Sequence, residues 1–183
     1  MERIRSGRPA RGFTLIELLV AAAVAAVVLG LAVPRFSRFV TEVRVSGAAA
    51  EIRGALHTAR AMAVARGSVV TLCKSADGST CATSGDWDQG WMLFADPANI
   101  GVLDASAEAP IRVWSKPLEG VRVWGNRYVS NYVSYRPWGE ARLASDALQM
   151  GRSWVCPRRS GVEGRELVVS RTGRVNVERF VCE

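Results

Sequence analysis

The chain has 183 residues, a formal net charge of +7 and four cysteines. Beyond a long N-terminal helix, roughly 115 residues remain, which is enough for one modest globular domain and excludes several. The single histidine, His57, lies in a helical pattern beside Arg53 and Arg60, and no serine or cysteine nucleophile has an evident base. We therefore expect no enzyme and no cofactor.

The most informative segment is the junction at Gly12, where a basic leader meets an apolar run that extends to Val33. Residues 13–33 number 21, or ~31 Å as a helix, close to the ~30 Å hydrocarbon core of a membrane. The only charged residue in this run is Glu17, and a carboxylate at that depth is costly unless a partner neutralises it. Cleavage after Gly12 would create such a partner, because the new amine of Phe13 carries the opposite charge.

An amine that meets Glu17 of a neighbouring chain makes a contact that does not close on itself, and such contacts build helical assemblies. The junction resembles the prepilin processing site, at which a membrane aspartyl peptidase cuts after the glycine and methylates the new amine. The resemblance implies a cleaved leader of residues 1–12, cleavage between Gly12 and Phe13, N-methylation of Phe13 and an assembly role for Glu17. A secretory signal peptide would have a shorter apolar core followed by an Ala-x-Ala-like site. A plain signal anchor is the other alternative, but it gives Glu17 no role.

The charges of the leader predict the orientation of the chain in the membrane. The positive-inside rule places in the cytoplasm the four arginines of the leader, Arg3, Arg5, Arg8 and Arg11. We expect a single-pass protein of the inner membrane with a periplasmic C-terminal domain, which later enters a pilus or pseudopilus. Together with Glu2, the leader accounts for +3 of the +7, so cleavage would leave a mature chain of +4.

The helical pattern continues beyond the apolar run. Apolar residues recur at three- and four-residue spacing, and arginines and glutamates fill the other faces. Arg66-Gly67 predicts the end of the helix. We expect one helix with a transmembrane and assembly segment at 13–33 and an amphipathic continuation at 34–66, which packs under a sheet.

After Gly67 the sequence changes to a period of two, with β-branched and aromatic residues that predict short strands. Antiparallel sheets packed as a sandwich, with one face on the helix, would give an α+β protein with a β domain over residues 67–183. Most tryptophans fall in or beside these strands and should be buried, with Trp87 and Trp138 the most exposed. The expected strands are 69–73, 90–94, 111–114, 121–124, 128–135, 148–156, 166–170 and 174–177.

The four cysteines allow three disulfide connectivities, and an extracytoplasmic domain favours disulfides. Pairing Cys73 with Cys81 closes a short loop around a turn, which leaves Cys156 with Cys182 to hold the C-terminus. Zinc is the alternative, but no Cys-x-x-Cys pair exists. The acidic segment 96–104 lacks oxygen ligands at positions where a calcium loop needs them, so we expect no metal.

A longer pattern connects these features. The cysteine-flanked loop is followed by a Trp-x-x-Gly-Trp-x-x-Phe-x-Asp segment at Trp87–Asp96, and Gly173-Arg174 stands near the C-terminus. These residues resemble the GspH/FimT family of minor pilins and pseudopilins. The resemblance implies a pilin fold, processing by prepilin peptidase, and helix-bundle assembly with other minor pilins or pseudopilins. A type IV pilus tip and a type II secretion pseudopilus fit the same leader and helix.

The C-terminal segment carries most of the remaining basicity, with seven arginines against three glutamates between Arg152 and Arg179. Arginines on adjacent loops can contact phosphates and give sequence-independent, salt-sensitive binding. Some FimT-type minor pilins capture DNA for natural transformation through Gly-Arg-x-Arg, but here the motif reads Gly173-Arg174-Val175-Asn176 and lacks the second arginine. DNA uptake is the alternative function. In the competing structural interpretation these arginines form ion pairs with Glu163, Glu166 and Glu178. The candidate DNA-binding residues are Arg158, Arg159, Arg171, Arg174 and Arg179.

Overall fold

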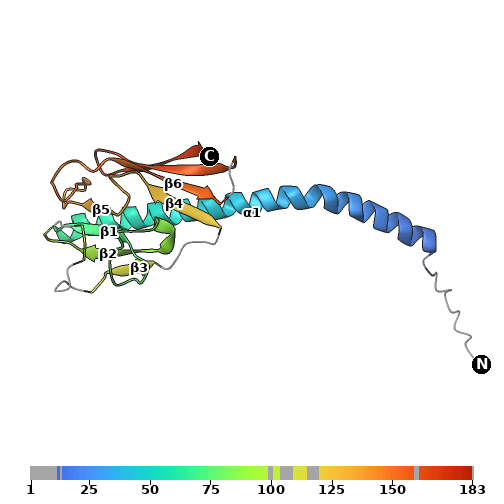
Figure 1. Ribbon diagram of the computed structural model, residues 1–183, viewed down its shortest axis with the longest axis horizontal. Helices are drawn as coiled ribbons and strands as arrows, with labels where there is room; N and C mark the ends of the chain where they lie inside the picture. Colours follow the sequence, from blue (N-terminus) through green and yellow to red (C-terminus); the bar gives the residue numbers. More distant parts are fainter. Residues whose placement is uncertain are drawn as a thin grey trace, which may run out of the picture. The chain divides into compact units, whose positions relative to one another are not determined.

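The computed structural model describes residue 12 and residues 14–98, 101–103, 109–114, 120–158 and 161–182, without the side chains of residues 31, 33 and 34. In this part of the chain one long helix is followed by two four-stranded antiparallel sheets (Figure 1). The chain divides into two compact units, residues 1–40 and residues 41–183, and the helix contributes to both.

Helix α1 comprises Leu15–Arg66, 52 residues, in agreement with the expected long helix. It ends where the sequence predicts, because Gly67 adopts a φ of +63°, the left-handed conformation that closes many helices. In the first unit the side chains of residues 15–30 are exposed, whereas in the second unit one face of the helix is buried.

Sheet A has the strand order β3-β2-β1-β5. Its central strand β1 is buried at every position, and Leu72 lies opposite Leu93 of β2 and Val133 of β5. One face of the sheet packs against the helix. The opposite face holds Met92 and Phe94 in a smaller apolar cluster. The strands are β1 (Val70–Lys74), β2 (Trp91–Ala95), β3 (Arg112–Trp114) and β5 (Tyr132–Tyr135).

Sheet B has the order β4-β6-β7-β8. Its inner face contributes Val123, Val155 and Leu167 to the core, and none of the three is exposed to solvent. Its outer face carries a row of aromatic rings, with Trp154 5.9 Å from Trp124 and 6.2 Å from Phe180 between ring centroids. The strands are β4 (Val121–Gly125), β6 (Gly151–Pro157), β7 (Glu163–Val169) and β8 (Val175–Val181).

Within residues 41–183, both sheets pack on α1 and share one core (Figure 1). The buried helical face is mostly alanine, which lets the backbones of helix and sheets approach closely. A larger side chain at any of these alanines would have to displace the core residues packed against it. The buried helical residues are Val45, Ala48, Ala49, Ile52, Ala55, Leu56, Ala59 and Ala63.

The observed fold is the predicted α+β arrangement, and each of the eight expected strands is present with ends shifted by a few residues. The expectation for Trp87 was wrong. A 3-10 turn, η1 (Trp87–Gln89), turns its indole inward, so that it is 3% exposed and its Nε1 donates to the Val129 carbonyl at 2.9 Å. Trp138 is 63% exposed, as expected.

Candidate processing, assembly and binding sites

The first turn of α1 contains a capping box formed by Thr14 and Glu17. The backbone N–H and the hydroxyl of Thr14 both donate to Glu17 Oε2 at 3.0 Å, and the Glu17 N–H donates to Thr14 Oγ1 at 3.3 Å. These bonds satisfy donors that a helix start leaves free. Gly12 is exposed, and apart from its chain neighbours no described atom lies within 4 Å of the place that a Cβ would take; Phe13 lies outside the described residues.

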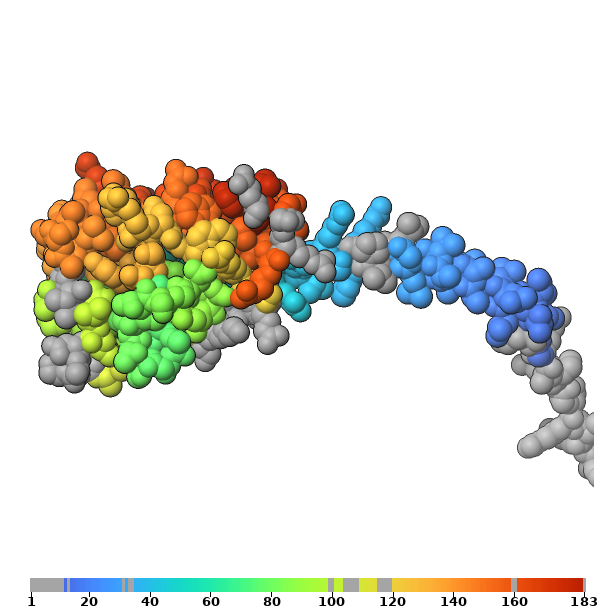
Figure 2. Space-filling model, viewed as in Figure 1, coloured from blue at the N-terminus to red at the C-terminus, as the bar shows by residue number. Residues whose placement is uncertain are grey.

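The helix that follows has an exposed apolar surface. One 18-residue window of α1 has a mean hydropathy of 2.6, with none of it buried, so by length and composition this helix could cross a membrane. Leu15 is 78% exposed and Leu29 is 60% exposed. The segment that holds them is drawn in blue in Figure 2. An exposed apolar surface of this extent marks a site of contact with lipid or protein.

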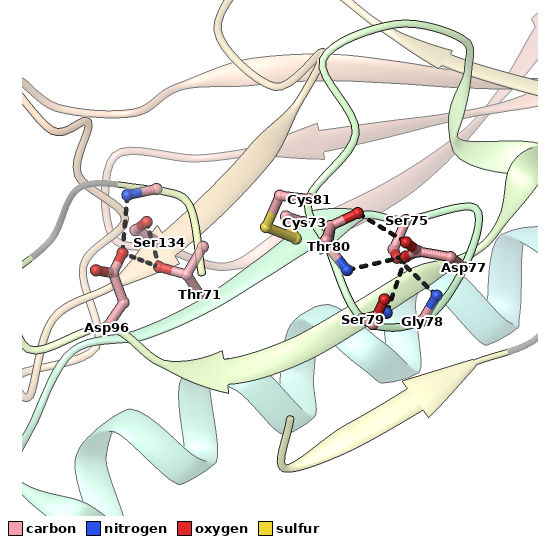
Figure 3. The surroundings of a disulfide bond; sticks show 11 residues. Thr71, Cys73, Ser75, Asp77, Gly78, Ser79, Thr80, Cys81, Asp96 and Ser134 are labelled. Atoms are coloured by element: carbon pink, nitrogen blue, oxygen red, sulfur yellow. Dashed lines mark hydrogen bonds between the residues drawn. A yellow bond between two sulfur atoms is a disulfide. The ribbon is translucent and has the colours of Figure 1, made fainter. Parts of the chain in front are cut away.

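Both expected disulfides are present in the structure. Cys73–Cys81 closes a loop beside sheet A, with Asp77 at its centre (Figure 3). The Asp77 carboxylate accepts the backbone N–H groups of Ser79 and Thr80 at 2.9 Å, and these bonds hold the pKa of Asp77 well below its usual range. The loop is therefore held by a covalent bond at its base and by an ionised carboxylate at its tip.

The second bridge, Cys156–Cys182, joins β6 to the residue after β8 and crosses the intervening strand β7 at Gly164. A Cβ at Gly164 would clash with the Cys182 sulfur and would lie 2.7 Å from the Val155 carbonyl oxygen. Glycine is therefore the residue that lets the bridge lie flat on the outer face of sheet B. This strap closes the C-terminal end of the domain.

The acidic segment after β2 has a structural role at its first residue. Asp96 is 3% exposed and accepts the Thr71 hydroxyl at 2.8 Å and the Gly101 N–H at 2.9 Å, and Thr71 Oγ1 lies 2.6 Å from Ser134 Oγ (Figure 3). The carboxylate thus ties the following loop to sheet A. In the described residues no three His, Cys, Asp or Glu side chains are grouped so that they could hold a metal, and Asp104 is not among these residues.

Sheet B separates the candidate DNA-binding arginines into two groups. Arg158 follows β6 and pairs with Asp88 at 2.9 Å, and Arg179 of β8 pairs with Glu163 at 3.5 Å. Both lie toward the end of the sheet where β7 begins, and Arg159 is outside the described residues. β7 has seven residues, so the opposite end of the sheet is ~20 Å away.

That opposite end is the β7–β8 turn, which carries Arg171 and Arg174. Both are exposed, and neither has an ion pair within the described residues. The turn is closed by hydrogen bonds from Ser170 N to the Arg174 carbonyl and from Gly173 N to the Ser170 carbonyl, both 2.9 Å. Hydrogen bonds from Trp138 and Arg142 lower the pKa of the Glu140 carboxyl, and the positive charge of Arg171 lowers it further. The turn is therefore basic but has an acidic neighbour.

Sequence reasoning missed the residue that fixes this turn, Arg60 of α1. Its guanidinium donates to the carbonyl of Gly139 at 2.9 Å and to that of Thr172 at 3.3 Å. These segments are 79 and 112 residues away along the chain, so no local pattern points to the contact. Gly173 completes it, because a Cβ there would clash with the Gly139 carbonyl oxygen.

The comparisons with known proteins agree with this geometry. Residues 7–33 match the prokaryotic N-terminal methylation motif, and residues 48–173 match the family described as type II transport protein GspH. The chain belongs to the GspH family. No curated protein matches the sequence of this GspH-family chain.

Two crystal structures of the type IV minor pilin FimU from Pseudomonas aeruginosa strain PAO1 resemble this GspH-family protein. In space group P21 the TM-score is 0.57, with 21% identity over 76% of this chain and 92% of FimU. In space group P65 the TM-score is 0.54, with 22% identity over 73% and 91%. The likeness establishes a pilin fold, a long N-terminal helix packed on antiparallel sheets.

Proposed function

We propose that this protein is a minor pilin or pseudopilin that is processed between Gly12 and Phe13 and then assembles through α1 into a type IV pilus or a type II secretion pseudopilus. The observation that carries the proposal is a methylation motif at residues 7–33 joined to an exposed apolar helix and a pilin fold. Its partners are prepilin peptidase, the inner membrane before assembly, and other minor subunits. The β domain faces the periplasm and acts by contact, not by catalysis.

The capping box suggests how Glu17 passes from membrane to filament. In the single chain both contacts from Thr14 go to Oε2, which keeps the carboxylate hydrogen-bonded inside an apolar helix. Oε1 is then the oxygen that the methylated amine of a neighbouring Phe13 can reach. A buried ion pair of this kind favours one axial offset between neighbouring helices over other offsets that would bury as much apolar surface. A subunit at a wrong offset would leave the carboxylate without a cation.

The proposal is tested by mass spectrometry and by fibre shearing in cells that make pili or pseudopili. We expect a mature chain that begins at methylated Phe13 and occurs in the sheared fraction. Glu17→Gln should be processed but depleted from fibres, while Glu51→Gln, an exposed substitution on the same helix, should behave as wild type. A mature chain that begins at any other residue would contradict the processing step.

DNA capture is a second candidate, favoured by the two exposed arginines of the β7–β8 turn that have no ion pair in the described residues. The sites at Arg158 and Arg179 are less suited, because nearby carboxylates already neutralise them. In a gel-shift assay with the full chain in detergent, Arg171→Gln with Arg174→Gln should weaken binding and lower the salt slope by about one unit per lost phosphate contact. Equal loss in Arg158→Gln with Arg179→Gln, or no shift of wild type at low salt, would rule out this turn as the site.

A further inference from the structure

A short segment of α1 directly after the apolar run combines exposed aromatic and basic side chains. Phe36 is 67% exposed and Phe39 is 61% exposed, and Arg35 and Arg38 are exposed beside them. The helix is unbroken here, so residues 35–39 occupy a slice of only ~6 Å along its axis. All four side chains lie within the first compact unit.

Helical spacing puts these residues on two adjacent stripes. Phe36 and Phe39 are three residues apart and share one stripe, and Arg35 and Arg38 share the next. Neither arginine has an ion pair in the part of the chain that the structure describes. The carboxylate one turn further on, Glu42, pairs instead with Arg165 at 3.6 Å.

The dimensions match one layer of a membrane. A bilayer is ~40–45 Å thick with its headgroups and ~30 Å without them, which leaves ~5–8 Å for each headgroup layer. Side chains of a helix lean toward its N-terminus, so the two phenyl rings lean toward the preceding apolar run. Long arginine side chains can extend the other way and keep their guanidinium groups in the polar layer.

We propose that Arg35, Phe36, Arg38 and Phe39 form a collar that binds the phosphate groups of anionic phospholipids at the periplasmic end of the span. This inference rests on the proposed membrane-inserted state. Removal of the leader at Gly12 would also remove its four arginines, Arg3, Arg5, Arg8 and Arg11. In the processed subunit Arg35 and Arg38 are then the arginines nearest the span, and the methylated amine of Phe13 is the basic group at its other end.

The collar can be tested by photo-cross-linking of the full chain in vesicles made from equal parts of phosphatidylcholine and phosphatidylglycerol. Phe39 is replaced by benzoylphenylalanine, and the cross-linked lipids are identified by mass spectrometry. One arginine near an anionic surface contributes about 1 kcal/mol, so we expect ~5-fold more phosphatidylglycerol than phosphatidylcholine in the adducts. Arg35→Gln with Arg38→Gln should bring the ratio to about one. The matched control, Arg53→Gln with Arg66→Gln, removes two exposed arginines of the same helix and should leave the ratio unchanged.

A second probe separates the collar from the membrane anchoring on which it rests. Benzoylphenylalanine at Val24, which is 58% exposed in the apolar run, should form lipid adducts with no headgroup preference. Two results would overturn the collar and leave the anchoring intact, provided that Val24 forms lipid adducts. One is an even headgroup ratio at Phe39, and the other is that Phe39 cross-links only to a second copy of the chain. Absence of lipid adducts at both positions would overturn the anchoring itself.

Discussion

Residues 15–40 and residues 41–66 belong to one continuous helix but differ in what surrounds their side chains. In the second part an alanine-rich face is buried by two sheets, and Ala48 and Ala59 are fully buried. In the first part large apolar residues such as Leu15 and Leu29 are exposed. Among the residues that the structure describes, the chain therefore provides packing partners for the second part of the helix and not for the first.

This difference bears on how each part is stabilised. A helix in water gains most of its stability from packing of an apolar face and little from intrinsic propensity. The second part gains that packing inside residues 41–183. The first part must obtain it from lipid or from the helices of other subunits, as the proposed function requires.

The largest expected effect is on solubility. Removal of residues 1–40 should leave a fragment that is monomeric without detergent and retains both disulfides, because the buried core begins at Val45 and the cut falls between the two compact units. The full chain should aggregate under the same conditions. Sedimentation and near-ultraviolet circular dichroism test this, and a fragment without native near-ultraviolet signal would show that residues 1–40 are needed for folding.

A leucine-to-alanine substitution should lower the free energy of unfolding by different amounts in the two parts of the helix. Leu56 is 3% exposed, and Leu56→Ala should lower the free energy of unfolding of the β domain by ~2–5 kcal/mol through lost contacts and a cavity. Leu29→Ala, at a 60% exposed site, should change it by less than ~0.5 kcal/mol. Thermal unfolding of the full chain in detergent measures both, and equal costs would contradict the comparison.

A glycine pair tests the packing of the second unit. Gly164→Ala should destabilise the domain by ~1–3 kcal/mol, because the new Cβ meets the Cys156–Cys182 bridge and a strand carbonyl. Gly54→Ala, on the exposed face of α1 with open space around it, should stabilise by up to ~1 kcal/mol through helix propensity. Urea titration gives both values, and a neutral Gly164→Ala would show that the bridge can move.

Arg60 offers a smaller test of the contacts between helix and loops. Arg60→Gln removes charged donors from the carbonyls of Gly139 and Thr172 and should cost ~1–2 kcal/mol. Faster hydrogen exchange in the β7–β8 turn should accompany the loss. Arg53→Gln, an exposed change two helical turns away, should leave both measurements unaltered.

The smallest effect concerns the Cys73–Cys81 loop and pH. The pKa of Asp77 is lowered from an ordinary value of 3.8 in the folded state, so its contribution to stability is fully present above that value and is lost as the pH falls below it. The difference in unfolding free energy between wild type and Asp77→Asn should therefore be constant from neutral pH down to about pH 5. It should shrink below pH 4, and a difference that grows with acid would contradict this assignment.

Much of the fold could be predicted because it depends on local pattern. Period-two segments predicted the strands, Arg66-Gly67 predicted the end of the helix, and the turn between Cys73 and Cys81 predicted their pairing. The capping box was also readable, since Thr14-x-x-Glu17 is its sequence signature. The charge of Glu17 in an apolar run suggested a partner in another subunit, whereas its hydrogen-bond partner within the chain is Thr14.

The rest depends on strand direction and on long-range contacts. Which arginines lie together follows from the antiparallel course of β6, β7 and β8, which sends Arg158 and Arg174 to opposite ends of sheet B. The burial of Trp87 follows from a carbonyl acceptor 42 residues away. Neither the register of a sheet nor a distant acceptor is encoded in a short window of sequence.

The strap across β7 also determines how the domain carries mechanical load. β8 lies at the edge of sheet B, and hydrogen bonds to β7 alone would let it peel away one bond at a time under a force on the C-terminus. Because Cys182 is joined covalently to Cys156 of β6, peeling cannot begin at that end of the strand. Tension on the C-terminal end must instead be shared by β6, β7 and β8, whose hydrogen bonds would then have to break together.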